Sequence, residues 1–260
     1  MQDERGEETI IGGLTRRILD ELAMRDALAI SSGLAHFRFR PADLVFVLDS
    51  LLVEFGVHVR LHTWFSAPVM EDGRISGVIV EDVSGRRMIR TRFVIDTTSD
   101  ALVVQRAGFA CREPAQVQPP TTCAVIEGLQ QFARDYPQYP LERILFDPQY
   151  PEALPPGFIW GAALPGSSDL RMVAGTRVHG ANCAHAEELT AAELEGRRQL
   201  RSMMDLLRHH FPGSRPPIPV ITASHIGIRQ TRHIHGLQRV HEQDLLSGHR
   251  FPDAIGCGTY

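Results

Sequence analysis

Two arginines near the end of the sequence are the side chains best suited to chemistry. Arg229 and Arg232 stand in the stretch Gly-Ile-Arg-Gln-Thr-Arg. A guanidinium stays ionised and holds a carboxylate through two parallel hydrogen bonds, so both are candidates to bind an acidic substrate or to stabilise developing negative charge. The alternative is that both are surface charges on an edge strand.

The 12 histidines raise the question of a metal site. His233 and His235 would lie on one face of a strand, but no third ligand has suitable spacing and no HExxH motif occurs. We therefore expect no metal. Because histidine titrates near neutrality, His225 and His233 are candidate proton donors, with a structural role as the alternative. A serine hydrolase is disfavoured because no GxSxG pentapeptide is present.

Composition removes further classes of function. All 27 basic residues are arginine, which excludes a Schiff-base lysine and a phosphate-binding lysine. The net charge of −4, without long charged runs, predicts neither nucleic acid nor an anionic membrane as a partner. The four cysteines form no CxxC pair, no apolar run is long enough to span a membrane, and the first ten residues are polar. We expect a cytoplasmic protein with reduced thiols.

Hydrophobic periodicity predicts the elements that position these residues. Apolar residues at three- and four-residue steps indicate a helix over 10–25, and Pro41 and Gly56 bracket a second helix. Alternation then predicts a strand over 57–61. Turn signals at Asp72-Gly73 and at Ser84-Gly85 predict a meander of three or four strands, with a further strand around Phe93 and Ile95.

The segment after the meander reads Asp-Thr-Thr-Ser-Asp over 96–100, and a short helix closed by Gly108 should follow it. Prolines between 114 and 156 indicate a domain crossing. Strands are expected at 158–164 and 171–178. The clearest helix should begin with a capping box of Thr190 and Glu193 and end at Pro212-Gly213. Its buried stripe comprises Ala192, Gly196, Leu200, Met203, Leu207 and Phe211.

This order of segments resembles a known family. Residues 57–108, which end in a meander followed by Thr-Thr-Ser-Asp and a helix, are similar to the middle of an FAD-dependent oxidoreductase of the glutathione-reductase-like class. Residues 188–213 and 223–260 are similar to the substrate domain of fumarate-reductase-type flavoproteins. The resemblance implies an α/β fold with α+β elements. It consists of an incomplete FAD/NAD(P)-binding Rossmann-like domain with an inserted β-meander over 1–112 and an α+β substrate domain over 113–260.

The resemblance also implies FAD as cofactor, a small organic molecule as substrate, and roles for individual residues. The backbone at Phe65 would lie near the adenine, and Gly12 and Gly13 could approach the flavin, although a turn before the first helix explains these glycines equally well. Thr98, Ser99 and Asp100 would lie near the ribose or pyrophosphate, with a plain helix cap as the alternative for Asp100.

Two departures from the family pattern limit these expectations. Ser99 stands where the family motif Ala-Thr-Gly-Asp has its glycine, and no GxGxxG motif occurs. We therefore interpret the chain as an internal fragment of a longer flavoprotein oxidoreductase. The alternatives are a non-catalytic remnant or interaction module that does not bind FAD by itself and, less favoured, a histidine-rich metal hydrolase.

Overall fold

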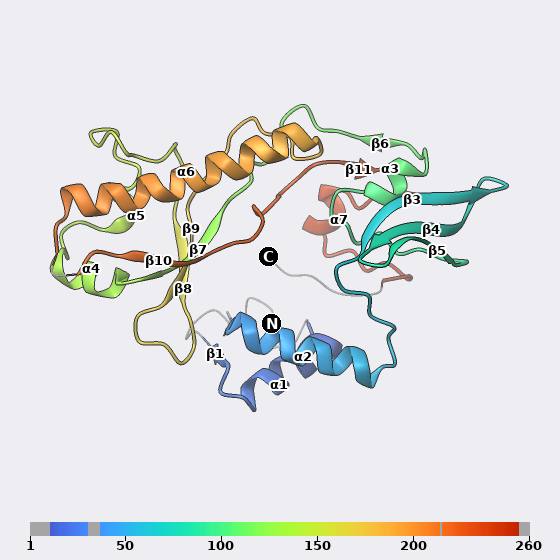
Figure 1. Cartoon of the computed structure of the whole chain (residues 1–260), viewed down its shortest axis with the longest axis horizontal. Coiled ribbons are helices and arrows are strands. Elements are labelled where there is room, and N and C mark those ends of the chain that lie inside the picture. Colours follow the sequence, from blue (N-terminus) through green and yellow to red (C-terminus); the bar gives the residue numbers. More distant parts are fainter. Residues whose placement is uncertain (1–10, 31–36, 214, 255–260) are drawn as a thin grey trace. The chain divides into compact units, whose positions relative to one another are not determined.

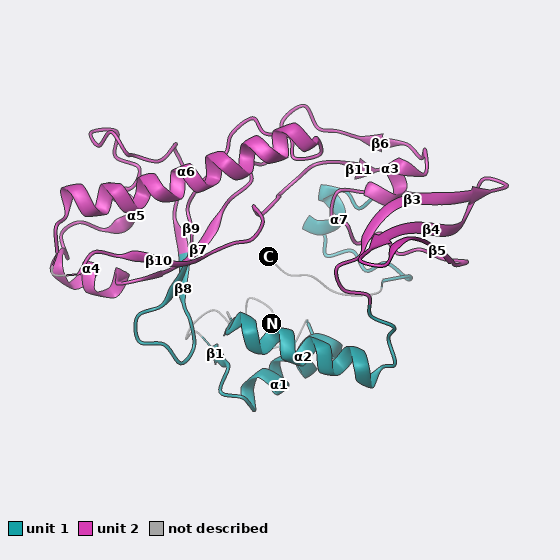
Figure 2. Ribbon diagram, viewed as in Figure 1, with its two compact units in different colours: residues 1–59, 161–172, 238–260 teal, residues 60–160, 173–237 magenta. Residues whose placement is uncertain are grey.

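The computed structural model describes residues 11–30, 37–213 and 215–254. The chain forms two compact units, shown in Figure 2. Unit 1 comprises 1–59, 161–172 and 238–260, and unit 2 comprises 60–160 and 173–237.

Unit 1 is built on two helices, which confirms both predicted helices of this region. Helices α1 (Gly13–Ala23) and α2 (Pro41–Glu54) bury Leu22, Ala27, Val47 and Leu51 in a small core. The predicted start of α1 at Ile10 lies outside the described residues. Strands β1 (Leu28–Ile30) and β2 (Phe37–Phe39) pair antiparallel, and α7 covers Glu242–Leu246.

Unit 2 contains the predicted meander, with strands β3 (Trp64–Glu71), β4 (Arg74–Asp82) and β5 (Gly85–Arg90) in antiparallel order (Figure 1). Asp72 and Gly73 both have positive φ angles, of 48° and 74°. A two-residue hairpin of this kind needs left-handed backbone, which explains why an Asp-Gly pair marks the turn. The short helix α3 (Leu102–Arg106) follows, as expected.

Two predicted strands are absent. Residues 57–61 and the segment around Phe93 and Ile95 form no strand, and their apolar side chains are exposed, with Leu61 at 71% and Ile95 at 86%. Alternation alone cannot make a strand, because its backbone groups need a partner strand. Among the described residues neither segment pairs with one.

A second sheet of unit 2 lies under the long helix α6 (Ala186–His210). Its strand order is β10 (Ile218–Thr222), β7 (Cys123–Glu127), β9 (Arg171–Ala174) and β8 (Trp160–Ala163), although 161–172 belong to unit 1. Apolar residues of β7, β9 and α6 share one core with α4 (Leu129–Asp135) and α5 (Leu141–Ile144). Strands β6 (Cys111–Arg112) and β11 (His233–Ile234) form a separate antiparallel pair. These helices and antiparallel sheets confirm the mixed α/β class.

Helix α6 confirms the predicted stripe and corrects its predicted start. All six stripe residues are buried, from Ala192 to Phe211. The capping box of Thr190 and Glu193 is wrong, because the helix begins at Ala186 and the Thr190 hydroxyl donates to the Ala186 carbonyl inside it. The Glu193 carboxylate instead accepts a hydrogen bond from the backbone N–H of Ile226, a tie that local sequence cannot reveal.

Gly196 allows α6 to approach β7 closely. A Cβ at this position would lie 2.1 Å from Oγ1 of Thr122. We expect Gly196→Ala to destabilise the fold by about 1–3 kcal/mol in urea unfolding, because the extra methyl overpacks this contact. Oγ1 of Thr122 has no hydrogen-bond partner among the described residues. Adding Thr122→Ala should therefore recover part of the loss, and a double variant no more stable than Gly196→Ala would contradict this explanation.

Candidate functional site

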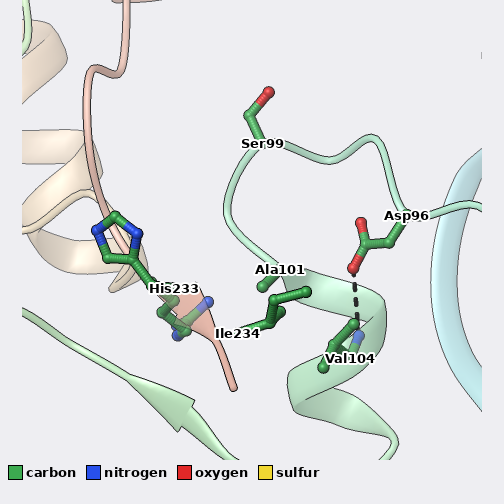
Figure 3. A pocket seen from close by; sticks show the side chains of 7 residues that line it. Asp96, Ser99, Ala101, Val104, His233 and Ile234 are labelled. Carbon is green, nitrogen blue, oxygen red and sulfur yellow. Dashed lines mark hydrogen bonds between the residues drawn. The ribbon is translucent and has the colours of Figure 1, made fainter. Parts of the chain in front are cut away.

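A pocket of about 350 Å³ in unit 2 brings together two distant stretches of the sequence. One side is the loop and helix after residue 95, and the other is β11 with the residue before it (Figure 3). The lining consists of Asp96, Ser99, Ala101, Val104, Arg232, His233 and Ile234. Two of the predicted site residues, Ser99 and Arg232, therefore line one pocket.

Asp96 fixes the loop to the start of α3. Its Oδ1 accepts hydrogen bonds from the backbone N–H of Thr98, at 3.1 Å, and from the Thr98 hydroxyl, at 2.6 Å. Its Oδ2 accepts from the N–H groups of Val103 and Val104, at 3.0 and 3.2 Å. The Thr98 hydroxyl in turn accepts from Leu102 N–H at 3.0 Å. Asp96 and Thr98 therefore cap the helix.

The interpretation of Asp100 as a plain helix cap is wrong, because its carboxylate accepts none of these bonds. Asp96 was not among the site residues predicted from the sequence. Its signal was a carboxylate two residues before a threonine at the entry to a helix, a pattern that favours local hydrogen bonding to the backbone.

The loop is held in an unusual backbone conformation. Ser99 has φ 69° and Ala101 has φ 54°, both in the left-handed region that favours glycine. Each such residue costs about 1–2 kcal/mol, and such strain persists where the surroundings enforce it. Figure 3 shows the Ser99 side chain directed away from α3, whereas Asp96 bonds to it. Ser99 thus adopts a backbone conformation that glycine adopts more readily than serine.

The electrostatics of Asp96 follow from these contacts. Burial raises the pKa of its carboxyl, but the hydrogen bonds from Thr98, Val104 and Val103 outweigh burial and hold the pKa below its usual value. A group with a lowered pKa stabilises the fold above its unfolded pKa, about 3.9 for aspartate, and this contribution is lost as pH falls through the folded value.

We expect Asp96→Asn to loosen the amino end of α3. Asparagine replaces one of the two acceptor oxygens with an NH2 group, so the N–H groups of Val103 and Val104, which share Oδ2, both lose their partner when the amide nitrogen takes that position. Hydrogen exchange at these amides should become about tenfold faster at neutral pH, because a hydrogen bond to a charged group contributes about 1.5–3 kcal/mol. In the wild type, protonation of Asp96 below about pH 4 should weaken this end of the helix. In the variant this pH dependence should be absent. Asp100→Asn is the matched control, and equal exchange in the two variants would contradict the role of Asp96.

The side chain of Arg232 is largely buried, with 9% of it exposed, and each of its three nitrogens donates a hydrogen bond. Its Nε donates to Oε1 of Glu113 at 3.0 Å, and its two terminal nitrogens donate to the carbonyls of Asp100, at 3.4 Å, and Ala184, at 2.8 Å. The hydrogen bond from Arg232 is the main reason that the pKa of Glu113 is lowered. The interpretation of Arg232 as a surface charge is therefore wrong, and the side chain joins the loop at Asp100 to two other segments of unit 2.

The remaining predicted site residues lie elsewhere. Arg229 is exposed and lines a different pocket. Phe65 lies at the start of β3, where the guanidinium of Arg106 stands 5.8 Å from its ring centroid. In unit 1, Gly12 is the N-cap residue of α1 and Gly13 is its first residue, with φ 56°.

The positions of the candidate histidines bear on the hypothesis of a metal site. His233 lines the first pocket, and His225 contacts Ser224 at its exposed position. Within 11–30, 37–213 and 215–254, no group of three or more His, Cys, Asp or Glu residues is placed to hold a metal ion. In the same ranges, no helix is both long and apolar enough to cross a membrane.

The structure is that of a mixed α/β protein. In its first pocket, the strained loop at Ser99 and the hydrogen-bonded side chain of Arg232 both contribute to the lining. A family model described as FAD dependent oxidoreductase matches residues 1–260. The chain therefore belongs to the FAD dependent oxidoreductase family, and FAD is its cofactor. This confirms the resemblance seen in the sequence. No curated protein gives a significant match.

Several solved structures are similar at low identity. CabE, an aromatic hydroxylase from angucycline biosynthesis, is 14% identical with a TM-score of 0.49 over 90% of this chain and 46% of its own. The myxobacterial chondrochloren halogenase CndH is 20% identical, with a TM-score of 0.42 over 76% and 41%. L-proline dehydrogenase from P. horikoshii is 16% identical, with a TM-score of 0.38 over 83% and 50%. The chain spans about half or less of these structures, so we base the assignment on the family match alone.

The described residues fit part of an FAD molecule. The backbone around Ser99 is in the left-handed conformation, and Ser99 and Ala101 line the pocket. The N–H groups of Leu102, Val103 and Val104 are already occupied by Thr98 and Asp96, so the start of α3 has no free donors for a pyrophosphate. The loop is therefore better suited to the ribose than to the phosphates.

Proposed function

We propose that the chain is part of an FAD-dependent oxidoreductase that acts on a small organic substrate. In this proposal, residues 1–112 belong to the FAD-binding domain and 113–260 form the substrate domain. The main support is the pocket that joins the loop at Ser99, from the first part, to Arg232 and His233, from the second. A site between a cofactor domain and a substrate domain is where such chemistry is expected.

The proposal assigns a task to each predicted residue. Bound FAD would supply the redox chemistry, and the protein would supply orientation and charge. Arg232 acts as a positioning residue with a permanent positive charge, because each of its three nitrogens donates a hydrogen bond to a protein group. Arg229, the other arginine predicted from the sequence, is assigned to contact a substrate carboxylate. Binding of FAD is assigned to the Phe65 backbone, Thr98, Ser99, Asp100, Gly12 and Gly13.

A titration of the chain with FAD, followed by quenching of flavin fluorescence, tests this proposal. Ser99→Glu places a bulky negative charge at the exposed loop position and should weaken FAD binding at least tenfold. Ser84→Glu makes the same change at an exposed turn of the meander and should leave binding unchanged. If the chain, shown to be folded by circular dichroism, gives no saturable quenching, the non-catalytic alternative is favoured instead.

A further inference from the structure

A second pocket of unit 2 contains two arginines and two exposed aromatic rings. Its volume is about 230 Å³, below the usual range for drug-sized ligands, so it suits a smaller molecule. The lining consists of Thr121, Phe158, Trp160, Ala174, Arg177 and Arg229. The described lining contains no carboxylate.

Buried hydrogen bonds fix the two segments that carry the arginines. Thr121 and Gly227 exchange backbone hydrogen bonds of 2.8 and 3.1 Å, which anchors the segment leading to Arg229. On the other side, the buried side chain of Gln199 donates to the carbonyl of Arg177 and accepts from its N–H, both at 2.8 Å. Hydrogen bonds thus fix both the backbone of Arg177 and the segment that leads to Arg229.

A ring contact and two hydrogen bonds fix the charged side chain of Arg177 at the pocket. Its guanidinium carbon lies 4.2 Å from the ring centroid of Phe158, and its Nη1 donates to the carbonyls of Phe158, at 2.7 Å, and Gly175, at 3.1 Å. Burial lowers the pKa of Arg177, and the like charge of Arg229 lowers it further. Two like charges near each other are unfavourable until an anion compensates them.

Neither arginine pairs with a carboxylate among the described residues, whereas eleven other arginines form ion pairs there. Both rings at the pocket remain largely exposed, with Phe158 at 66% and Trp160 at 56%. The exposed aromatic surface lies beside guanidinium groups that have no carboxylate partner. Such a surface is complementary to a planar ligand that carries a negative charge.

We propose that this pocket binds an aromatic carboxylate, with Arg177 and Arg229 on the carboxylate and with Phe158 and Trp160 against the ring. The inference rests on the proposed function and names its substrate class. Phosphate sites typically present backbone N–H groups at a helix start, whereas this pocket offers aromatic walls. An aromatic acid therefore fits the lining better than inorganic phosphate.

Isothermal titration calorimetry of the chain with benzoate tests the proposal, with benzamide as the neutral probe of similar shape. Benzoate should bind saturably and at least tenfold more tightly than benzamide. Arg229→Gln should weaken benzoate binding at least tenfold and leave benzamide unchanged, and Arg229→Lys should fall between, because lysine keeps the charge without the planar fork. Arg201→Gln, an exposed arginine of α6, is the charge-matched control and should bind benzoate normally.

Three results would overturn the proposal: no heat with benzoate, equal affinities for benzoate and benzamide, or unchanged benzoate binding in Arg229→Gln. Competition by inorganic phosphate as strong as that of benzoate itself would overturn it in favour of a phosphate site. The separate FAD titration distinguishes the two hypotheses. FAD binding without benzoate binding removes only the substrate class, whereas benzoate binding without FAD binding removes the proposed oxidoreductase function.

Discussion

Replacing Arg232 with glutamine is expected to destabilise the protein by about 2–4 kcal/mol. The substitution removes a buried guanidinium and leaves the Asp100 and Ala184 carbonyls without their donors. It also leaves Glu113 without its main partner. The Glu113 side chain is 39% exposed and can be hydrated, so the loss should fall below that of a fully buried ion pair.

Urea unfolding at neutral pH measures this effect. Arg232→Lys should be intermediate, because one ammonium group cannot reach three acceptors on different segments. Arg229→Gln is the matched control, since Arg229 is exposed, and its free energy of unfolding should change by no more than about 0.5 kcal/mol. If the free energy of unfolding fell equally in Arg232→Gln and Arg229→Gln, the hydrogen bonds of Arg232 would not be what stabilises the site.

Replacing Gln199 with methionine is expected to cost about 2–4 kcal/mol of stability, because two backbone groups of Arg177 lose their partners. Gln199 is 2% exposed and lies on the buried face of α6. Methionine is similarly long and helix-favouring, so the substitution removes mainly the hydrogen bonds. Urea unfolding again provides the measurement.

Arg201→Met is the control for Gln199→Met on the same helix. Arg201 is exposed, so this variant should stay within about 0.5 kcal/mol of wild type. If Gln199→Met were as stable as this control, the buried amide would not be needed to hold the Arg177 backbone.

Local sequence signals predicted much of the fold. Pro41 and Gly56 mark the ends of α2, Asp72-Gly73 marks the hairpin, and the stripe of α6 identifies its buried face. These signals succeed because they depend on neighbours within a turn of helix or a hairpin. The strands predicted at 57–61 and around Phe93 failed because a strand depends on a partner that alternation does not specify.

The candidate site could be predicted only in part. Ser99 and Arg232 are predicted from separate motifs, but only the structure shows that they line one pocket. Spacing alone does not distinguish the clamped Arg232 from the exposed Arg229, because the partners of Arg232 are carbonyls and a carboxylate on distant segments. Arg177 went unnoticed for the same reason, since no local pattern places it beside Arg229 in one pocket.

The Arg232 clamp has a consequence for the order of folding. Arg232 bonds to Glu113, which lies 119 positions earlier in the chain, and to Asp100, which lies 132 positions earlier. Contacts of such long range require large loops to close and are typical of late, slow steps in folding. The helices and the meander can thus form from local contacts before this pocket exists, and assembly of the site becomes one of the final events in reaching the native state.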